Sequence, residues 1–275
     1  MPAPLETLYE LERGAALPLP PELERLYGRL QMAQPAGRPA VIANFVTTLD
    51  GVTALNMPGG AVGDISGSNA QDRLLMGLLR ATADAVIVGA GTLRSVPKHL
   101  WTPAHIYRPL ADAYQALRAN LGKTEPPLNV IVTAQGALDV TLPVFQSDEV
   151  STLIVTTASG AARLSGQPLP SSTQMVVAAE AGSLSASAIL EATTRARQSQ
   201  IILVEGGPLL MGDFFAEQRL DDLFLTLAPQ VAGRDASVER PGLVAGHLFA
   251  PEQPRWGTLV SVRRGESFLF LRYAF

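Results

Sequence analysis

The sequence predicts an α/β domain built on a mostly parallel β-sheet. From residue 40 to residue 233, continuous apolar segments of strand length alternate with amphipathic segments of helix length. Strands that are apolar along their whole length are buried on both faces, so helices should cover both sides of this sheet. Residues 257–275 indicate two further strands joined by a turn at 264–266, which adds an antiparallel hairpin.

Apolar and β-branched runs bounded by turn residues mark the expected parallel strands. The first run, AVIANFVTTLDG, ends at Asp50-Gly51, a turn-forming pair. Two of the middle runs, around residues 130 and 154, are joined by only about 17 residues. The expected strands lie within residues 40–51, 83–92, 128–134, 151–157, 173–179, 201–207 and 221–233.

Helices are expected where apolar residues recur at helical spacing. Residues 68–82 carry leucines at 74, 75, 78 and 79, with Ser68 or Asn69 as the N-cap. The segment 208–218 begins with Pro208, whose missing N–H costs nothing at the first helical position. The segments 110–121 and 185–198 also have a helical pattern.

Residues 1–38 are predicted to form an N-terminal helical arm, and residues 39–275 the main domain. Within the arm, residues 4–13 (PLETLYELER) should form one or two helical turns, and residues 21–30 (PELERLYGRL) a second short helix. Prolines at 18, 20 and 21 separate the two segments.

Composition excludes several classes of protein. The net charge of −4 provides no basic footprint for nucleic acid. Cysteine is absent and only three histidines are present, so no disulfide and no metal site is expected. An acidic start without an apolar run is unlike a signal peptide, and no stretch is long enough to span a membrane. A cytoplasmic protein is the expectation.

Two strand-to-helix junctions are predicted to bind phosphate. In open α/β sheets, ligands lie beyond the carboxyl ends of the strands. The junction at 204–208 (VEGGP) has glycines that let a ligand approach the backbone, and it precedes a helix whose N-terminus favours a diphosphate. The junction at 88–94 (VGAGTLR) adds a hydroxyl and a guanidinium. Together they could hold the two ends of a dinucleotide, although a glycine pair after a strand is also an ordinary tight turn.

The candidate polar residues each have two interpretations. Glu205 could accept hydrogen bonds from a polar heterocycle or complement the following helix dipole. Asp50 is favoured as a turn former and is also retained, with Glu205, as a candidate catalytic residue. Arg80 complements the end of its helix. His99 and His105 are interpreted as surface or lid residues, and Asp221-Asp222 as a solvated strand start.

Six short motifs, in order, resemble the reductase domain of the bacterial riboflavin-biosynthesis deaminase–reductase, the RibD C-terminal type. They are T-L-D-G at 48–51, I-S-G at 65–67, L-L-R-A-x-A-D-A at 78–85, V-G-A-G-T at 88–92, V-E-G-G-P at 204–208 and D-x-L-F-L-T-L-A-P at 221–229, with Gly233 just after. The resemblance spans residues 40–275 and does not include the deaminase half. It implies a dihydrofolate reductase-like fold with three layers, α/β/α.

The resemblance also implies a function: hydride transfer from NADPH to a pyrimidine such as 5-amino-6-(5-phosphoribosylamino)uracil, by a homodimer. Arg80, Glu205 and Asp64 would face the substrate. Arg94 could pair with the 2′-phosphate that distinguishes NADPH from NADH. With the residues of the two glycine junctions added, the residues expected at the cofactor are Thr47, Thr48, Ser66, Gly89, Gly91, Thr92, Arg94 and the run 206–213, which includes Gly206, Gly207, Pro208, Leu209 and Leu210.

Two departures from the family pattern keep other functions open. Val52 stands where the family commonly has Lys or Arg, and residues 95–101 (SVPKHLW) replace an acidic stretch and a phosphate-binding Arg. Arg94, Lys98 or Arg108 could compensate for the lost cation. The alternatives are a reductase of dihydrofolate or another heterocycle, and a nucleotide-binding protein without turnover.

Overall fold

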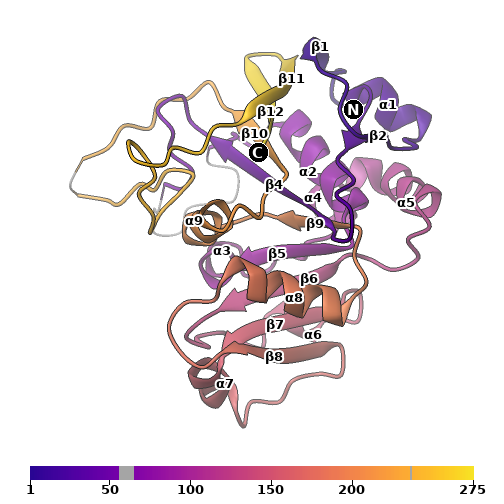
Figure 1. Ribbon diagram of the computed structural model, residues 1–275. Coiled ribbons are helices and arrows are strands. Elements are labelled where there is room, and N and C mark those ends of the chain that lie inside the picture. The colour runs from indigo at the N-terminus through magenta and orange to yellow at the C-terminus, as the bar shows by residue number, and fades with distance from the viewer. Residues whose placement is uncertain (56–64, 236) are drawn as a thin grey trace.

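The predicted parallel sheet is present and forms the centre of the protein. A computed structural model describes residues 1–55, 65–235 and 237–275. The main sheet has ten strands in the order β1-β11-β12-β10-β4-β9-β5-β6-β7-β8, seen as the fan of arrows in Figure 1. From β10 to β8 all neighbours are parallel. These strands are β4 (Ala40–Thr47), β5 (Ala85–Gly89), β6 (Leu128–Thr133), β7 (Thr152–Thr157), β8 (Thr173–Ala179), β9 (Ile201–Val204) and β10 (Asp222–Leu227).

The C-terminal hairpin completes the other side of the sheet, as predicted. Strands β11 (Thr258–Gly265) and β12 (Phe268–Ala274) pair with each other, and β12 pairs antiparallel with β10. The turn between them includes Glu266, whose φ is 53°. The α/β fold with a mostly parallel sheet and antiparallel C-terminal strands is therefore confirmed.

Alternate residues of each strand pack on opposite faces, which gives the three layers. On β5, Val86 and Val88 belong to one apolar cluster, and Ala85 and Ile87 belong to the other. The first cluster lies under α1 (Pro21–Tyr27), α2 (Ala70–Thr82) and α5 (Ala111–Asn120). The second lies under α8 (Ala186–Ala196) and α9 (Pro208–Ala216). Shorter helices are α3 (Ala90–Ser95), α4 (Pro103–Ile106), η1 (Arg108–Leu110), α6 (Pro143–Gln146) and α7 (Ala158–Leu164).

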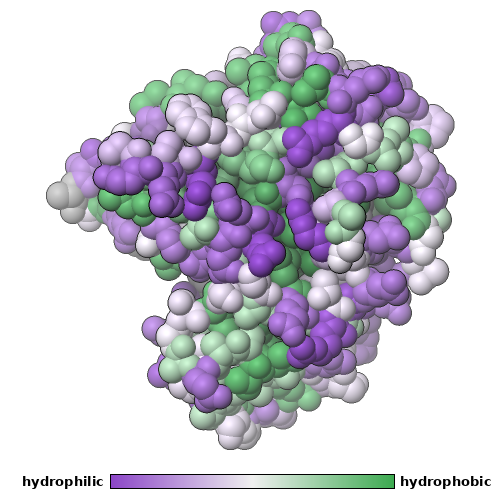
Figure 2. Space-filling model, viewed as in Figure 1, coloured by the Kyte–Doolittle hydropathy of each residue, from purple (hydrophilic) through white to green (hydrophobic). Residues whose placement is uncertain are grey.

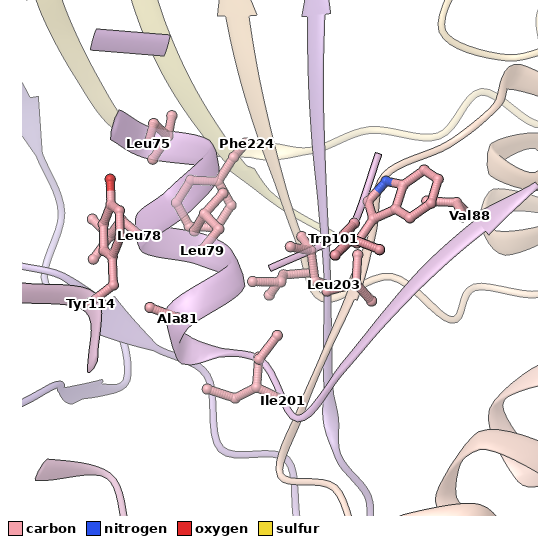
Figure 3. Packing of buried hydrophobic residues seen from close by; sticks show 14 of the residues in the cluster. Leu75, Leu78, Leu79, Ala81, Val88, Trp101, Tyr114, Ile201, Leu203 and Phe224 are labelled. Atoms are coloured by element: carbon pink, nitrogen blue, oxygen red, sulfur yellow. The ribbon is translucent and has the colours of Figure 1, made fainter. Parts of the chain in front are cut away.

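Helix α2 is the main element of the first cluster. Figure 3 shows its leucines packed between Tyr114 and Phe224, with Trp101 nearby. The Asn69 side chain caps the helix by accepting hydrogen bonds from the amides of Gln71 and Asp72. This confirms Asn69 rather than Ser68 as the N-cap. The capped, buried helix gives any side chain along it a fixed position.

The prediction of a helical turn over residues 4–13 is wrong. Residues Glu6–Glu10 form strand β1, which pairs antiparallel with β11 at the edge of the sheet. Long-range ion pairs from Arg263 to Glu10 and from Arg264 to Glu6 support this pairing. Tertiary contacts therefore override local helix propensity. The second predicted helix of the arm is present as α1, and β2 (Ala15–Ala16) and β3 (Gln31–Met32) pair as a separate small sheet.

The interpretation of Asp221-Asp222 as solvated is also wrong. The Asp222 side chain is fully buried and accepts two hydrogen bonds from Arg272, at 2.9 and 3.2 Å. Asp221 pairs with Arg38 and also accepts from the amide of Val41. Both carboxylates are buried because each has a guanidinium partner, which is the usual condition for burying a charge.

The exterior mixes polar and apolar side chains. On the face drawn in Figure 2, hydrophilic residues surround smaller apolar areas. In the ranges that the structure describes, none of the helices combines the length and the apolar character needed to cross a bilayer.

Candidate active site

The two predicted glycine junctions meet at one end of the sheet. Strands β9 and β5 are parallel neighbours, so their carboxyl ends lie side by side, and α3 and α9 start from them (Figure 1). The Gly89 amide donates to the Gly206 carbonyl at 2.7 Å, and the Glu205 amide donates to the Ile87 carbonyl at 2.9 Å. The two junctions thus form one continuous backbone surface.

Glycine is required at the centre of this surface. Gly206 has a φ of 113°, a conformation that other residues rarely adopt. A Cβ there would lie 3.3 Å from the Phe45 ring and 3.6 Å from Thr92 Oγ1. The peptide bond from Gly206 to Gly207 is cis. Gly207 then caps α9, whose first-turn amides have no partner within the helix.

A cavity of about 240 Å³ opens beside these junctions. Side chains of α2 and β4 line it together with the segment after α3. Its volume is below the roughly 300–1,000 Å³ of pockets that enclose a whole small-molecule ligand. It therefore suits a ring and its substituents. The lining residues are Asn44, Phe45, Val46, Thr53, Ala54, Asp72, Met76, Arg80, Thr92, Ser95, Val96, His99, Trp101, Ile106, Glu205, Gly207 and Pro208.

A buried ion pair joins Arg80 and Glu205 in the cavity wall. Arg80 Nε donates to Glu205 Oε1 at 2.9 Å, and Arg80 Nη2 donates to Oε2 at 2.6 Å. The two side chains are 1% and 5% exposed. Bidentate pairing of this kind fixes the plane of the carboxylate. Glu205 keeps unused lone pairs that could accept a hydrogen bond from a ligand.

His99 completes the surroundings of Arg80, and its interpretation as a surface or lid residue is wrong. Arg80 Nη1 lies 2.8 Å from His99 Nε2 and 3.3 Å from the Thr102 carbonyl oxygen. Because arginine can only donate, Nε2 must accept and the proton resides on Nδ1. Burial, reinforced by the charges of Arg80 and His105, lowers the pKa of His99 to about 2. The imidazole is therefore neutral. His105 is exposed, as expected.

Asp50 organises a turn and does not line the cavity. One carboxylate oxygen accepts from Thr48 Oγ1 at 2.6 Å and from the Ala232 amide at 3.0 Å; the other accepts from the Gly233 amide at 2.8 Å. These hydrogen bonds, that of Thr48 first, lower the pKa of Asp50 to about 2. The structure thus shows the turn role of Asp50 and brings Glu205, not Asp50, to the cavity.

The remaining expected cofactor residues fall into three groups. Thr92, Gly207 and Pro208 line the cavity. Gly89, Gly91, Gly206, Leu209 and Leu210 lie at the junctions or in the first turns of α3 and α9, and Arg94 lies in the last turn of α3. Leu209 is exposed and Leu210 is buried in the core. Thr47, Thr48 and Ser66 are buried outside the cavity lining, and the Thr47 hydroxyl donates to the Thr48 carbonyl. Asp64 lies outside the described residues.

The departures at Val52 and residues 95–101 have clear structural consequences. Val52 is fully buried and packs with Ile65 and Ala228, so this position presents no side chain to the cavity. In the second segment, Trp101 is buried and its amide donates to Asn129 Oδ1. This packing is what places His99 beside Arg80. Among the described residues, no group of three potential ligands could hold a metal ion.

Sequence reasoning did not identify Asn44, Asp72 or His99 as cavity residues. Asp72, Met76 and Arg80 all line the cavity at i, i+4 and i+8 of α2. This helical spacing was a usable signal, because residues four apart lie on one face. His99 had no such signal, because a loop has no period that fixes its side-chain directions.

Comparison with known proteins identifies a family. Residues 39–257 match the family model described as the RibD C-terminal domain. No curated protein sequence matches significantly.

Solved structures with a similar fold include a pyrimidine reductase-like protein from Corynebacterium diphtheriae. It has 23% identity and a TM-score of 0.68, over 92% of this chain and 97% of that one. A diaminohydroxyphosphoribosylaminopyrimidine deaminase/5-amino-6-(5-phosphoribosylamino)uracil reductase from Thermotoga maritima has 19% identity and a TM-score of 0.58, over 86% of this chain and 56% of that one. The riboflavin biosynthesis reductase of Saccharomyces cerevisiae has 13% identity and a TM-score of 0.53, over 86% and 90%. At these identities the likeness concerns the fold.

Proposed function

The chain belongs to the RibD C-terminal domain family, and from this membership we propose that it is an NADPH-dependent reductase of a pyrimidine-type heterocycle. The first candidate substrate is 5-amino-6-(5-phosphoribosylamino)uracil, which appears in the name of the Thermotoga protein. The observation that carries the proposal is the joined glycine surface of β5 and β9 beside a cavity that contains the Arg80–Glu205 pair.

The residues at the junction fit a pyridine dinucleotide. The Gly206–Gly207 backbone has no side chains, and a Cβ on either glycine would lie 3.6 Å from Thr92 Oγ1. Amides at the start of α9 suit a diphosphate. When bound, the cofactor supplies the hydride. Thr92, Gly207 and Pro208 would contact its ring, because they also line the cavity.

Glu205 is the proposed contact for the heterocycle, and Arg80 is its positioning residue. Four hydrogen bonds from Arg80 go to protein acceptors, two of them to Glu205. Arg80 is thus largely engaged and neutralises the carboxylate. Glu205 can then accept an N–H from the edge of a ring. Its carboxylate is preorganised, so binding requires little rearrangement.

Two measurements test the proposed function. Isothermal titration should detect NADPH binding, and the absorbance of the reduced nicotinamide should fall when the correct heterocycle is added. The panel contains 5-amino-6-(5-phosphoribosylamino)uracil and dihydrofolate. Absence of heat with both NADPH and NADH would refute the dinucleotide site. Binding without oxidation across the panel would leave the non-catalytic alternative as the better description.

Glu205→Gln tests the substrate contact. The amide keeps the shape but alters the hydrogen bonds, so we expect kcat/KM to fall by roughly 100-fold or more, while the Kd for NADPH stays within about twofold. Glu191→Gln on the exposed face of α8 is the matched control and should leave both constants unchanged. Equal activities of the two variants would remove Glu205 from the mechanism.

The buried Val52 favours a second candidate, a reductase of dihydrofolate or a related ring. A phosphorylated substrate needs a cation near the cavity, and Val52 does not supply one. Arg94, Lys98 and Arg108 are exposed and make no ion pair within the described ranges. Turnover of dihydrofolate without turnover of the phosphorylated pyrimidine would decide for this candidate.

A homodimer, implied by the family, is proposed as well and is tested by analytical ultracentrifugation.

A further inference from the structure

Asp72 is a buried carboxyl group in the cavity wall that the function proposed above does not use. It lies in the first turn of α2, is 4% exposed and lines the same cavity as Glu205. Met76 and Arg80 follow it at intervals of four residues, so all three side chains lie along one face of the helix. Strand β4 contributes Asn44 to the same cavity, and its buried Oδ1 has no hydrogen-bond partner among the residues that the structure describes.

The capping hydrogen bonds of helix α2 do not involve the Asp72 carboxyl group. An acid at this position often bonds the amide of the N-cap residue in a capping box. Here the Asn69 amide already donates to the Ser66 carbonyl at 3.0 Å. The Asn69 side chain in turn caps the amides of Gln71 and Asp72. The carboxyl group of Asp72 is therefore not used in capping the helix.

The surroundings of Asp72 favour its protonated form. Burial is the largest effect and raises the pKa of Asp72 to about 6. Hydrogen bonds from the hydroxyl groups of Thr226 and Ser66 oppose this rise. The negative charge of Glu205 adds to it, and the positive charge of Arg73 opposes it. Arg80 lies farther along the same face and is paired with Glu205. A carboxyl group inside a ligand cavity that keeps its proton up to about pH 6 is suited to acid catalysis.

We propose that Asp72 is the proton donor of this site and protonates the ring or imine nitrogen of the bound heterocycle. The inference rests on the proposed reductase function. The geometry that points to it is a buried carboxyl on the cavity face of α2, in a cavity that also contains the Arg80–Glu205 pair and the Asn44 amide oxygen, which has no hydrogen-bond partner among the described residues.

The step balances as the reduction of a C=N double bond. The carbon receives a hydride from the reduced nicotinamide, and the loss of this hydride oxidises the cofactor by two electrons. The π electrons of the double bond become a nitrogen lone pair, and this pair takes the proton from the Asp72 hydroxyl. The product carries one new C–H bond and one new N–H bond. Asp72 remains as a carboxylate and regains its proton from water.

Asp72→Asn tests the proposal. The amide is of the same size and cannot supply the proton, so we expect kcat to fall by about 100-fold or more. The Kd for NADPH should stay within about twofold, which also shows that the variant is folded. Asp112→Asn, in the exposed first turn of α5, is the matched control. A kcat for Asp72→Asn within threefold of the wild type overturns the assignment and leaves the proposed reductase function intact.

The wild-type pH profile is a second test, which needs no variant. Because the protonated form is the active one, kcat should decrease tenfold per pH unit above about pH 6; a flat profile overturns the proposal. If the wild type turns over none of the heterocycles in the panel, the proposed function itself is refuted.

A third readout is independent of activity. Nuclear magnetic resonance of carboxyl-labelled aspartate in the ligand-free protein should show one resonance, missing in Asp72→Asn, that titrates near pH 6. If that resonance shows an ionised group throughout the range above about pH 4, Asp72 holds no proton to donate and the proposal fails.

Discussion

Replacing Arg80 by Met should destabilise the protein strongly. The substitution removes a charge that is 1% exposed and leaves the Glu205 carboxylate, which is 5% exposed, without its partner. Breaking a buried pair in this way costs about 3–5 kcal/mol. It also leaves His99 Nε2 and the Thr102 carbonyl without the donor that they now have. The free energy of unfolding should therefore fall by at least the lower of these values.

The expected change can be expressed as a melting temperature. For a chain of 275 residues the entropy of unfolding is about 0.6 kcal/mol/K, so a loss of about 4 kcal/mol lowers Tm by about 7 °C. Arg195→Met is the matched control, because the Arg195–Glu191 pair is 69% exposed on both sides. A surface pair of this kind contributes less than about 1 kcal/mol.

A double-mutant cycle isolates the pair itself. Arg80→Met with Glu205→Leu removes both charges, so the double variant should be more stable than the sum of the two single losses predicts, by about 3 kcal/mol. Urea denaturation followed by tryptophan fluorescence gives the free energies, and calorimetry gives Tm. Single losses below about 1 kcal/mol, or losses that add to within about 0.5 kcal/mol, would refute the reasoning that the pair is tightly coupled.

Three further predictions address other parts of the molecule. Asp72→Asn should gain about 2.4 kcal/mol over the wild type as the pH rises from 4 to 7 in urea titrations, because the folded wild type holds a proton up to about pH 6 that the unfolded chain releases near 3.8; a constant difference would contradict the raised pKa. Arg94→Ala should weaken the binding of NADPH more than that of NADH in calorimetry, because the exposed guanidinium is expected to pair with the 2′-phosphate; equal weakening would refute that role. Gly77→Ala should cost about 1–3 kcal/mol in the same denaturation assay, since its Cβ would lie 2.5 Å from the Tyr114 ring; no loss would mean that the ring moves freely.

Most of the fold could be predicted because local patterns determine it. The continuous apolar runs became β4 to β10, and the leucine spacing with Asn69 became the capped helix α2. The strand at Glu6–Glu10 could not be predicted this way. Its partner β11 lies more than 240 residues away, and a short, charged segment carries no signal for a pairing so distant in sequence.

The candidate site was predicted only in its backbone part. Glycines after strands indicate close approach wherever they occur, so the junctions at Gly89 and Gly206 were found. Which polar side chains reach the cavity depends on tertiary packing. Asp72 looks like any acid in the first turn of a helix, and His99 looks like any loop residue, until tertiary packing places both in the cavity wall. Neither burial nor the resulting pKa is encoded in local sequence.

The pairing of β1 with β11 has a consequence for handling this protein. Strand β1 occupies the hydrogen-bonding edge that β11 would otherwise leave open. An open edge strand is a template on which another chain can add its own strand. A version truncated before residue 12 would lose both that cover and the charges of Glu6 and Glu10. With the segment in place, the outer edge of the sheet is the five-residue strand β1, which carries two glutamates, and short charged edge strands are less prone to pair with other chains.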